Sequence, residues 1–234
     1  MQVFGSISTN LTLVSATQAE AYFFKTLMKY SVTKFKSLEI ALKEMEPLVR
    51  DGNYLLTGKP FKKLGGMLPR EILGNWLVCA VVNANEAEKI CTFTSDPQSG
   101  DGVIVNLHTN EGWLTEHVMV GRPHKAYEFK LSIEDRIIEA YSGKVKKGGY
   151  TYARGKTLII FLEVNSGKWQ PRKLSRRLPS DLVFSDVWVF GLLPFNDGKY
   201  VYGISQLGDI ERQAPTWIVQ IDDQFSSWNV EILQ

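Results

Sequence analysis

The chain contains only two cysteines, Cys79 and Cys91, among its 234 residues. One falls in a helical pattern and the other at the start of a strand pattern, and no Cys/His cluster has the spacing of a zinc site. The sequence therefore argues against a structural zinc. We expect both cysteines to be reduced thiols in the core, since free cysteine is among the most buried residue types.

Long apolar runs are absent as well. No segment approaches the ~18 apolar residues of a membrane-spanning helix. The opening residues, MQVFGSISTN, lack the basic flank and apolar stretch of a secretory signal. We therefore expect a soluble, cytoplasmic protein with no membrane contact. With 44% apolar and 12% aromatic residues, the chain has enough material for a sizeable buried core, which argues against disorder.

Acidic residues are scarce in one stretch of the chain. Residues 141–180 hold one acid, Glu163, against ten basic residues, so this stretch carries +9 and the remainder −7, although the net charge is only +2. Such a block can neutralise phosphates and attract a nucleic acid in a salt-dependent way. The alternative interpretation is a solvated basic surface without a specific partner.

Three segments in the first third of the chain have helical periodicity. Residues 16–30 and 33–49 each place apolar side chains on one face, the second ending near Pro47, and we expect them to form an N-terminal helical hairpin. Residues 69–83 begin with Pro69, which suits the first helical position, and predict an apolar, well-buried helix.

Beyond this helix the apolar period changes from about 3.6 towards 2. Turn-forming residues separate the segments 90–95, 102–107 and 113–120, which are rich in β-branched and aromatic residues. They predict a meander of three strands.

A further helix is predicted for residues 132–149. Ser132 is its expected cap, with Asp135 three positions on, and Gly148 and Gly149 mark its end.

The C-terminal part reads as strands. Residues 156–164 form a continuous apolar run, which is typical of a central strand covered on both faces. Four further strand patterns follow at 186–195, 199–207, 216–221 and 228–233.

No internal repeat or flexible linker is visible, so we expect one α/β domain over residues 1–234. Its expected architecture is a central mixed β-sheet flanked by helices. The parts are an N-terminal helical lobe (1–66), a core (67–165), and a basic loop with a C-terminal β extension (166–234).

Two acids stand near the beginnings of neighbouring strand patterns. Asp101 opens "GDGVIV", Glu116 lies within "WLTEHV", and the intervening hairpin would bring them side by side. Two carboxylates about one ion apart suit Mg²⁺, which takes one or two protein carboxylates together with waters and phosphate oxygens. Such an ion can orient a water for attack on a phosphodiester. The alternative is ordinary structure, because Asp before Gly is common turn chemistry and Glu is common on exposed strands.

The order of these elements resembles the PD-(D/E)XK nuclease superfamily. A helix with an acid, a meander with acids on its second and third strands, a helix and a buried strand follow one another over residues 67–165. The resemblance implies an αβββαβ, restriction-endonuclease-like core. It also implies a metal-dependent endonuclease that hydrolyses phosphodiester bonds in DNA. Asp101 and Glu116 would bind Mg²⁺ or Mn²⁺, and Glu71 would match the acid that many members carry on the first helix.

The chain departs from this pattern at one position. The family usually has a lysine two residues after the second acid, where this chain has Val118. In some relatives that lysine has moved to the following helix, and Lys144 and Lys147 are the candidates here. Such a cation would stabilise charge beside the phosphate. His117 is expected to point to the face opposite Glu116, because side chains alternate along a strand.

DNA is the partner that the basic block and the resemblance imply, with a homodimer as one arrangement for cutting both strands. Trp169 lies among lysines and arginines, in a loop suited to gripping a phosphate backbone and stacking on a base. The expected nucleic-acid contacts are Lys146, Arg154, Lys168, Trp169, Arg172, Lys173, Arg176 and Arg177.

Two other functions stay open from the sequence. Val118 favours a non-catalytic nucleic-acid-binding or partner-binding protein on the same core. An interaction or immunity-like protein without a nucleic-acid role is the third reading, if the basic block pairs with the acidic remainder. Each acid and lysine also has a plain structural role available: Glu71 near a helix N-terminus, and Lys144 and Lys147 near a helix C-terminus, all complement the helix dipole.

Overall fold

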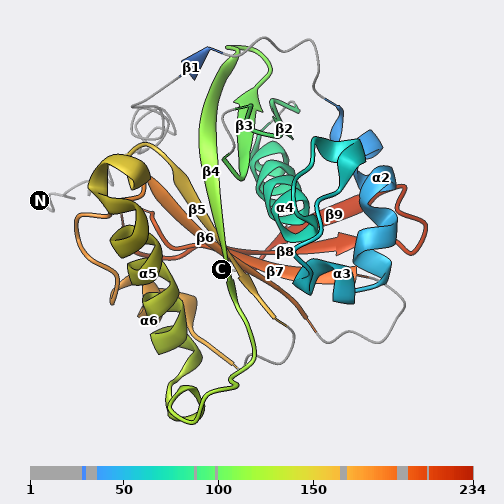
Figure 1. The fold of residues 1–234 in the computed structure, drawn as a ribbon. Coiled ribbons are helices and arrows are strands. Elements are labelled where there is room, and N and C mark those ends of the chain that lie inside the picture. Colours follow the sequence, from blue (N-terminus) through green and yellow to red (C-terminus); the bar gives the residue numbers. More distant parts are fainter. Residues whose placement is uncertain are drawn as a thin grey trace, which may run out of the picture.

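The computed structural model describes residues 28–29, 36–86, 89–97, 100–163, 168–193, 200–209 and 211–233. A mixed β-sheet forms the centre, and helices cover both of its faces (Figure 1). The expected α/β class, with a central mixed sheet flanked by helices, is confirmed. None of the helices in the described ranges combines the length and apolarity needed to cross a membrane.

The N-terminal helix predicted for residues 16–30 lies outside the described residues, apart from two positions. Met28 and Lys29 form strand β1 (Met28–Lys29), which pairs antiparallel with Gly112 and Glu111. The helix prediction is therefore wrong at these two residues. Pairing with a distant strand has overridden the local periodicity, as tertiary contacts commonly do.

Helix α2 (Leu38–Arg50) corresponds to the second predicted helix and begins five residues later than expected. Ser37 caps it, because its hydroxyl accepts a hydrogen bond from Ile40 N at 3.3 Å. Pro47 lies inside the helix and does not end it. Helix α3 (Asn53–Leu56) follows directly, and an apolar stripe along α2 is buried: Leu38, Ala41, Leu42, Met45, Leu48 and Val49.

Helix α4 (Pro69–Asn85) matches its predicted position, with Pro69 in the first turn. Glu71 Oε2 accepts a hydrogen bond from Leu68 N at 2.7 Å, which satisfies one of the free N–H groups at the helix start. Every residue from Ile72 to Val81 is buried. This explains why the helix is apolar on all sides: it packs between α2 and the sheet.

The predicted meander is confirmed as β2 (Cys91–Thr94), β3 (Gly102–Asn106) and β4 (Glu111–Val120). Neighbouring strands are antiparallel, and Gly102 pairs with Thr115. This register places Asp101 beside Glu116.

Helix α5 (Ile133–Ala153) has the predicted cap, since Ser132 Oγ accepts from Asp135 N at 3.1 Å and Asp135 Oδ2 accepts from Ser132 N at 3.1 Å. The expected end at the two glycines is instead a kink. Gly149 has φ 75°, in the left-handed region, and a last short turn continues to Ala153.

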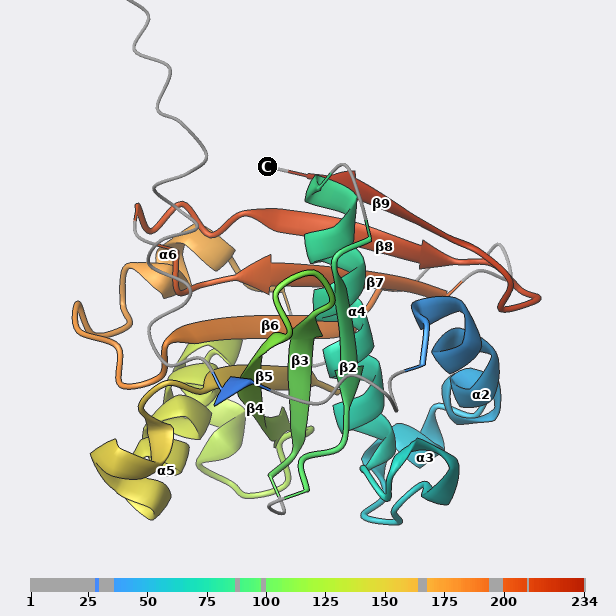
Figure 2. The same ribbon diagram turned by 90° about the horizontal axis from the view of Figure 1, so that it is seen from above.

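The remaining strands extend the same sheet. They are β5 (Thr157–Leu162), β6 (Asp186–Leu192), β7 (Tyr200–Gln206), β8 (Thr216–Ile221) and β9 (Trp228–Ile232), with the short helix α6 (Pro171–Ser175) before β6. The sheet order is β2-β3-β4-β5-β6-β7-β8-β9, and β1 pairs with β4. Strands β4, β5 and β6 are parallel, and the pairs on either side are antiparallel. Strand direction turns strongly between β2–β3 and β8–β9, as in other twisted sheets (Figure 2).

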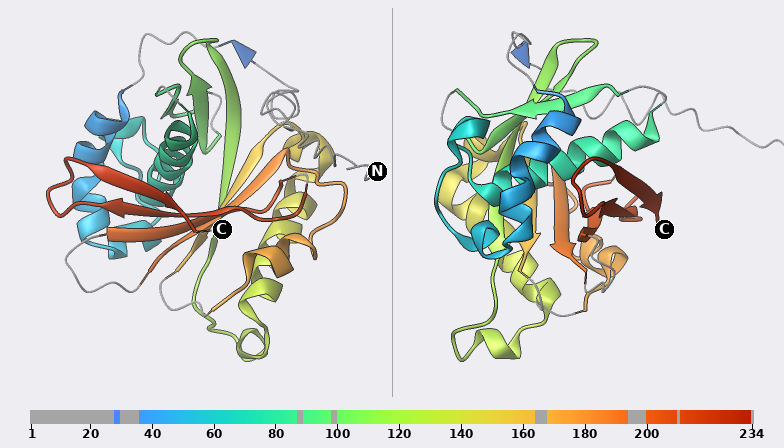
Figure 3. Two further views of the ribbon diagram at one scale, coloured as in Figure 1. Left: turned by 180° about the vertical axis from the view of Figure 1, so that it is seen from behind. Right: turned by 90° about the vertical axis from the view of Figure 1, so that its right-hand side faces the viewer.

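The sheet separates two hydrophobic cores. Helices α2, α3 and α4 lie on one face and α5 and α6 on the other (Figure 3). In β5, Ile159 and Phe161 belong to the first core, whereas Leu158 and Ile160 belong to the second. This alternation explains the unbroken apolar run in the sequence.

Both cysteines are free and buried, as predicted. Burial raises the pKa of Cys79 on α4, and it raises the pKa of Cys91 on β2 to about 12. Neither thiol is therefore ionised at neutral pH.

One buried acid, Asp186, has a structural role at the start of β6. Its carboxylate accepts hydrogen bonds from Val187 N at 2.8 Å, Trp188 Nε1 at 2.7 Å and Gln206 Nε2 at 2.7 Å. Burial raises the pKa of Asp186 to about 6, against the effect of these three donors. The bond to Gln206 ties β6 to β7.

Candidate active site

Glu116 on β4 is a buried carboxylate held between two lysines. Its side chain is 4% exposed. Oε2 accepts a hydrogen bond from Lys144 Nζ on α5 at 3.1 Å, and Oε1 accepts one from Lys156 Nζ, just before β5, at 2.7 Å. Burial alone would raise the pKa of Glu116, but hydrogen bonds from Lys156, Tyr152 and Lys144 lower it below its ordinary value. Glu116 is therefore ionised at neutral pH.

Asp101 lies next to this carboxylate and shares one of its lysines. Lys144 Nζ is 3.7 Å from Asp101 Oδ2, and the same oxygen accepts a hydrogen bond from His117 N at 2.6 Å. Burial raises the pKa of Asp101, and the negative charge of Glu116 acts in the same direction. The two acids named from the sequence thus meet at one ammonium group, contributed by the helix that follows the meander.

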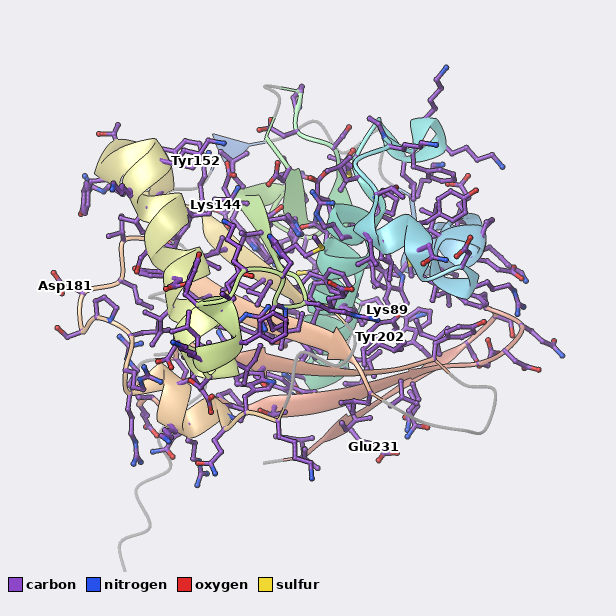
Figure 4. All side chains as sticks on the ribbon, turned by 60° about the horizontal axis from the view of Figure 1, so that its bottom comes forward. Lys89, Lys144, Tyr152, Asp181, Tyr202 and Glu231 are labelled. Carbon is purple, nitrogen blue, oxygen red and sulfur yellow. The ribbon has the colours of Figure 1, made fainter. Side chains whose placement is uncertain are left out.

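Tyr152 and Lys156 form the wall of the site on the far side of Glu116. Lys156 Nζ lies 3.8 Å from the centre of the Tyr152 ring, a cation–π contact. Gly148 makes room for this ring, because a Cβ there would lie 2.0 Å from Tyr152 Cδ1. Lys144 and Tyr152 both belong to the second half of α5, and Figure 4 shows them close together.

Glu71 lies at the edge of the site. Within the described residues it forms no hydrogen bond or ion pair with Lys144 or Lys156. Its Oε2 accepts from Leu68 N. Burial raises the pKa of Glu71, and the charge of Asp101 adds to the effect, which places the two carboxyl groups near each other. Its first role is to complete the start of α4, as the structural alternative proposed.

A buried polar cluster lies behind the acids, on the α4 face of the sheet. Asn75 and Thr115 both approach Gly102 closely: a Cβ at Gly102 would be 2.4 Å from Asn75 Nδ2 and 2.9 Å from Thr115 Oγ1. His117 packs against Gly74, on the opposite face from Glu116, as expected from strand alternation. Burial lowers the pKa of His117 well below its ordinary value, so its imidazole is neutral at neutral pH. His117 acts on the site through its backbone N–H.

The other candidate cation, Lys147, is exposed and makes no ion pair with an acid of the described chain. Lys146 and Arg154 are also exposed on the last turns of α5. The partly exposed Arg70 on α4 stands at the rim of the site, where its positive charge opposes the rise in the pKa of Asp101.

The second half of the basic block lies elsewhere. Arg177, just after α6, forms an ion pair with Asp135 in the first turn of α5, roughly 14 Å of helix away from Lys144. Trp169 is partly buried and packs against the core beneath α5, so only part of its surface is open to a ligand. The exposed members of this second group are Lys168, Arg172, Lys173, Arg176 and Arg177.

The two acids suit one kind of metal site and not another. Within the described residues no cluster of three or more His, Cys, Asp or Glu side chains is arranged to hold a metal ion. A closed structural site is therefore not formed there. Mg²⁺, however, is commonly held by one or two carboxylates, with waters and substrate phosphates in its other positions. Asp101 and Glu116 fit that requirement.

Comparison with protein-family models, with curated proteins and with solved structures gives no match for this chain. The chemical interpretation of the site therefore depends on its geometry.

Sequence reasoning overlooked Lys156 as a site residue and gave Tyr152 no role. A signal for Lys156 was partly present: a lysine just before a strand parallel to β4 lies beside β4, although only the register, which pairs Thr157 with Thr115, puts it near Glu116. Tyr152 is placed by the kink at Gly149, whose effect on the path of the chain is not encoded in any periodicity.

Proposed function

We propose that this protein is a metal-dependent nuclease that hydrolyses phosphodiester bonds in DNA. The observation that carries the proposal is the position of Lys144 Nζ, 3.1 Å from Glu116 and 3.7 Å from Asp101. Asp101 just before β3, Glu116 on the adjacent strand β4 and one lysine from the next helix meet at one point, and the positive charge of Arg70 acts on the same acids. This is the combination that the resemblance to PD-(D/E)XK nucleases leads one to seek.

The topology supports the same proposal. Helix α4 is followed by the antiparallel β2-β3-β4 meander, helix α5 and strand β5, which is parallel to β4. This is an αβββαβ order. Asp101 directly precedes the second strand, and Glu116 lies within the third. We infer a restriction-endonuclease-like core for residues 67–165, to which β6–β9 add an extension of the same sheet.

The chemistry assigns a role to each group. A Mg²⁺ ion at this position would polarise the phosphodiester and lower the pKa of the attacking water. Asp101 and Glu116 supply the carboxylate oxygens that hold it, and Lys144 offsets negative charge on the phosphate oxygens. In the overall hydrolysis, the oxygen of one water forms a bond to phosphorus while the bond to the leaving sugar oxygen breaks. One proton of the water passes to that leaving oxygen, and the hydroxyl stays on phosphorus.

Cleavage of plasmid and short duplex DNA with Mg²⁺ or Mn²⁺ tests this proposal. Asp101→Asn and Glu116→Gln should each reduce cleavage by at least about a hundredfold, the usual scale for losing a charge-stabilising group. Glu231→Gln is the matched control, because Glu231 is an exposed acid on β9, well away from Lys144 (Figure 4). Equal cleavage by wild type and both site variants, each shown to be folded by circular dichroism, would end the catalytic proposal.

Non-catalytic nucleic-acid binding is the second candidate, favoured by a specific observation. Both carboxylate oxygens of Glu116 already accept a hydrogen bond from a lysine, and Val118 occupies the position of the usual motif lysine. A retained fold with a self-neutralised site would bind duplex DNA through its basic rim without cutting it. Fluorescence anisotropy at low and moderate salt, run beside the cleavage assay, distinguishes the two functions: salt-sensitive binding that ignores Asp101→Asn, with no cleavage, would select this one.

A further inference from the structure

The two lysines on Glu116 are held differently. Lys144 Nζ bridges two acids, Glu116 at 3.1 Å and Asp101 at 3.7 Å. Lys156 Nζ contacts Glu116 alone, at 2.7 Å, through the other carboxylate oxygen. Glu116 Oε2 and Asp101 Oδ2, two oxygens that the carboxylates could offer to a shared metal ion, thus both face Lys144.

Lys156 is held on several sides. The Tyr152 ring covers its ammonium at 3.8 Å. Its backbone is fixed too, because Lys156 N donates to Ala153 O at 3.1 Å and Lys156 O accepts from Ser185 N at 2.8 Å. The Lys144 ammonium has only the two acids as its partners in the described chain, and it stands on a helix surface from which a long side chain can swing into solvent.

An ammonium and a divalent cation cannot share this position. Mg²⁺ binds carboxylate oxygens at about 2.1 Å, so an ion between Glu116 Oε2 and Asp101 Oδ2 would lie inside the space that Lys144 Nζ fills. Two positive groups in such proximity repel strongly in a partly buried site.

From this asymmetry we propose that Lys144 is a built-in competitor for the metal. The divalent cation binds by displacing Lys144 from Glu116 and Asp101, while Lys156 and Tyr152 keep Glu116 in place. This inference rests on the proposed metal-dependent function. The displaced ammonium stays at the rim, beside the position that a phosphate must occupy, and there it supplies the cation missing at Val118. The site is thus neutralised internally in the absence of metal and gains its free lysine only when metal arrives.

Direct measurement of Mn²⁺ binding, without DNA, tests the proposal. Free Mn²⁺ is followed by electron paramagnetic resonance in titrations of wild type, Lys144→Met and Lys147→Met. Lys144→Met should bind Mn²⁺ at least about tenfold more tightly than wild type, a difference that corresponds to ~1.4 kcal/mol. Lys147→Met removes the same charge from the same helix without touching the acids, so its affinity should stay within about twofold of wild type.

A second measurement needs no variant and so is unaffected by any folding defect. Wild-type protein is acetylated briefly with and without saturating Mn²⁺, and the modification of each lysine is read by mass spectrometry. Metal should increase the labelling rate of Lys144 several-fold and leave Lys156 protected. Lys147, exposed throughout, serves as the internal reference.

The outcomes separate this inference from the function on which it rests. Mn²⁺ binding that requires Asp101 and Glu116 but is no tighter in Lys144→Met, with Lys144 labelling unchanged, overturns the displacement and leaves the nuclease proposal standing. If metal increases the labelling of Lys156 and not that of Lys144, then Lys156 is the competing lysine, and the proposal is overturned as well. If neither wild type nor Lys144→Met binds Mn²⁺, the metal-dependent function fails and the inference falls with it.

Discussion

Gly148→Ala should destabilise the protein, although the same change in a helix usually stabilises it. Replacing a helical glycine by alanine normally raises the free energy of unfolding by about 0.5–1 kcal/mol. At Gly148, however, the new Cβ would lie 2.0 Å from Tyr152 Cδ1 and 2.4 Å from Cγ, so the ring must leave its place. Forcing an extra methyl into packed surroundings costs about 1–3 kcal/mol. The displaced ring would also lose its cation–π contact with Lys156, worth about 0.5–1 kcal/mol.

Gly143→Ala provides the matched control. Gly143 lies on the same helix, and a Cβ there would meet nothing within 4 Å. Urea unfolding followed by circular dichroism should therefore show Gly143→Ala more stable than wild type by about 0.5–1 kcal/mol. Gly148→Ala should be less stable than wild type by about 1–3 kcal/mol. Stabilisation of both variants to the same extent would show that the Tyr152 ring is not packed against Gly148 and would remove the wall that holds Lys156.

Three further predictions concern the interior. The pKa of Asp186 is raised in the folded state from 3.8 to about 6, so its contribution to stability is full below pH 3.8 and is lost as the pH rises through 6. Between pH 4 and pH 7 this loss of stability amounts to about 2 kcal/mol, and Asp186→Asn should abolish it. Urea unfolding at the two pH values measures the change, and parallel pH profiles of the variant and wild type would contradict the prediction. Gly102→Ala should lower the free energy of unfolding by about 2 kcal/mol, because its Cβ would clash with the Asn75 amide. Thermal unfolding measures this, and a midpoint temperature equal to that of wild type would contradict the close contact. Cys79 and Cys91 should resist Ellman's reagent at pH 8 until the chain is unfolded, and rapid reaction in native buffer would show that they are not buried.

Most of the fold was predictable from local patterns in the sequence. Period and turn residues located the meander, α4, α5 and all the strands after β5, because each buries one or both faces in a way that fixes its apolar spacing. The errors arose where distant contacts decide. Met28 and Lys29 pair with β4 against their helical pattern.

The candidate site was predictable only in part, for a related reason. Asp101 and Glu116 are joined by one hairpin, so their proximity follows from strand register. The choice between Lys144 and Lys147 depends on the rotation of α5 about its axis, and the role of Lys156 depends on β5 lying parallel beside β4. The packing of the Trp169 side chain against the core could not be read from its basic neighbours in the sequence.

The separations along the chain have a consequence for how the molecule is assembled. Asp101 contacts the His117 backbone only 16 residues away, whereas Lys144 and Lys156 reach Glu116 from 28 and 40 residues away. Closing a short loop costs less entropy than closing a long one. The contact between the two strands of the hairpin is therefore the cheaper one to form, and the two lysines must be brought in across longer loops. Neutralising the acids thus depends on the docking of α5 and β5, so a change that loosens either element would expose both carboxylates at once.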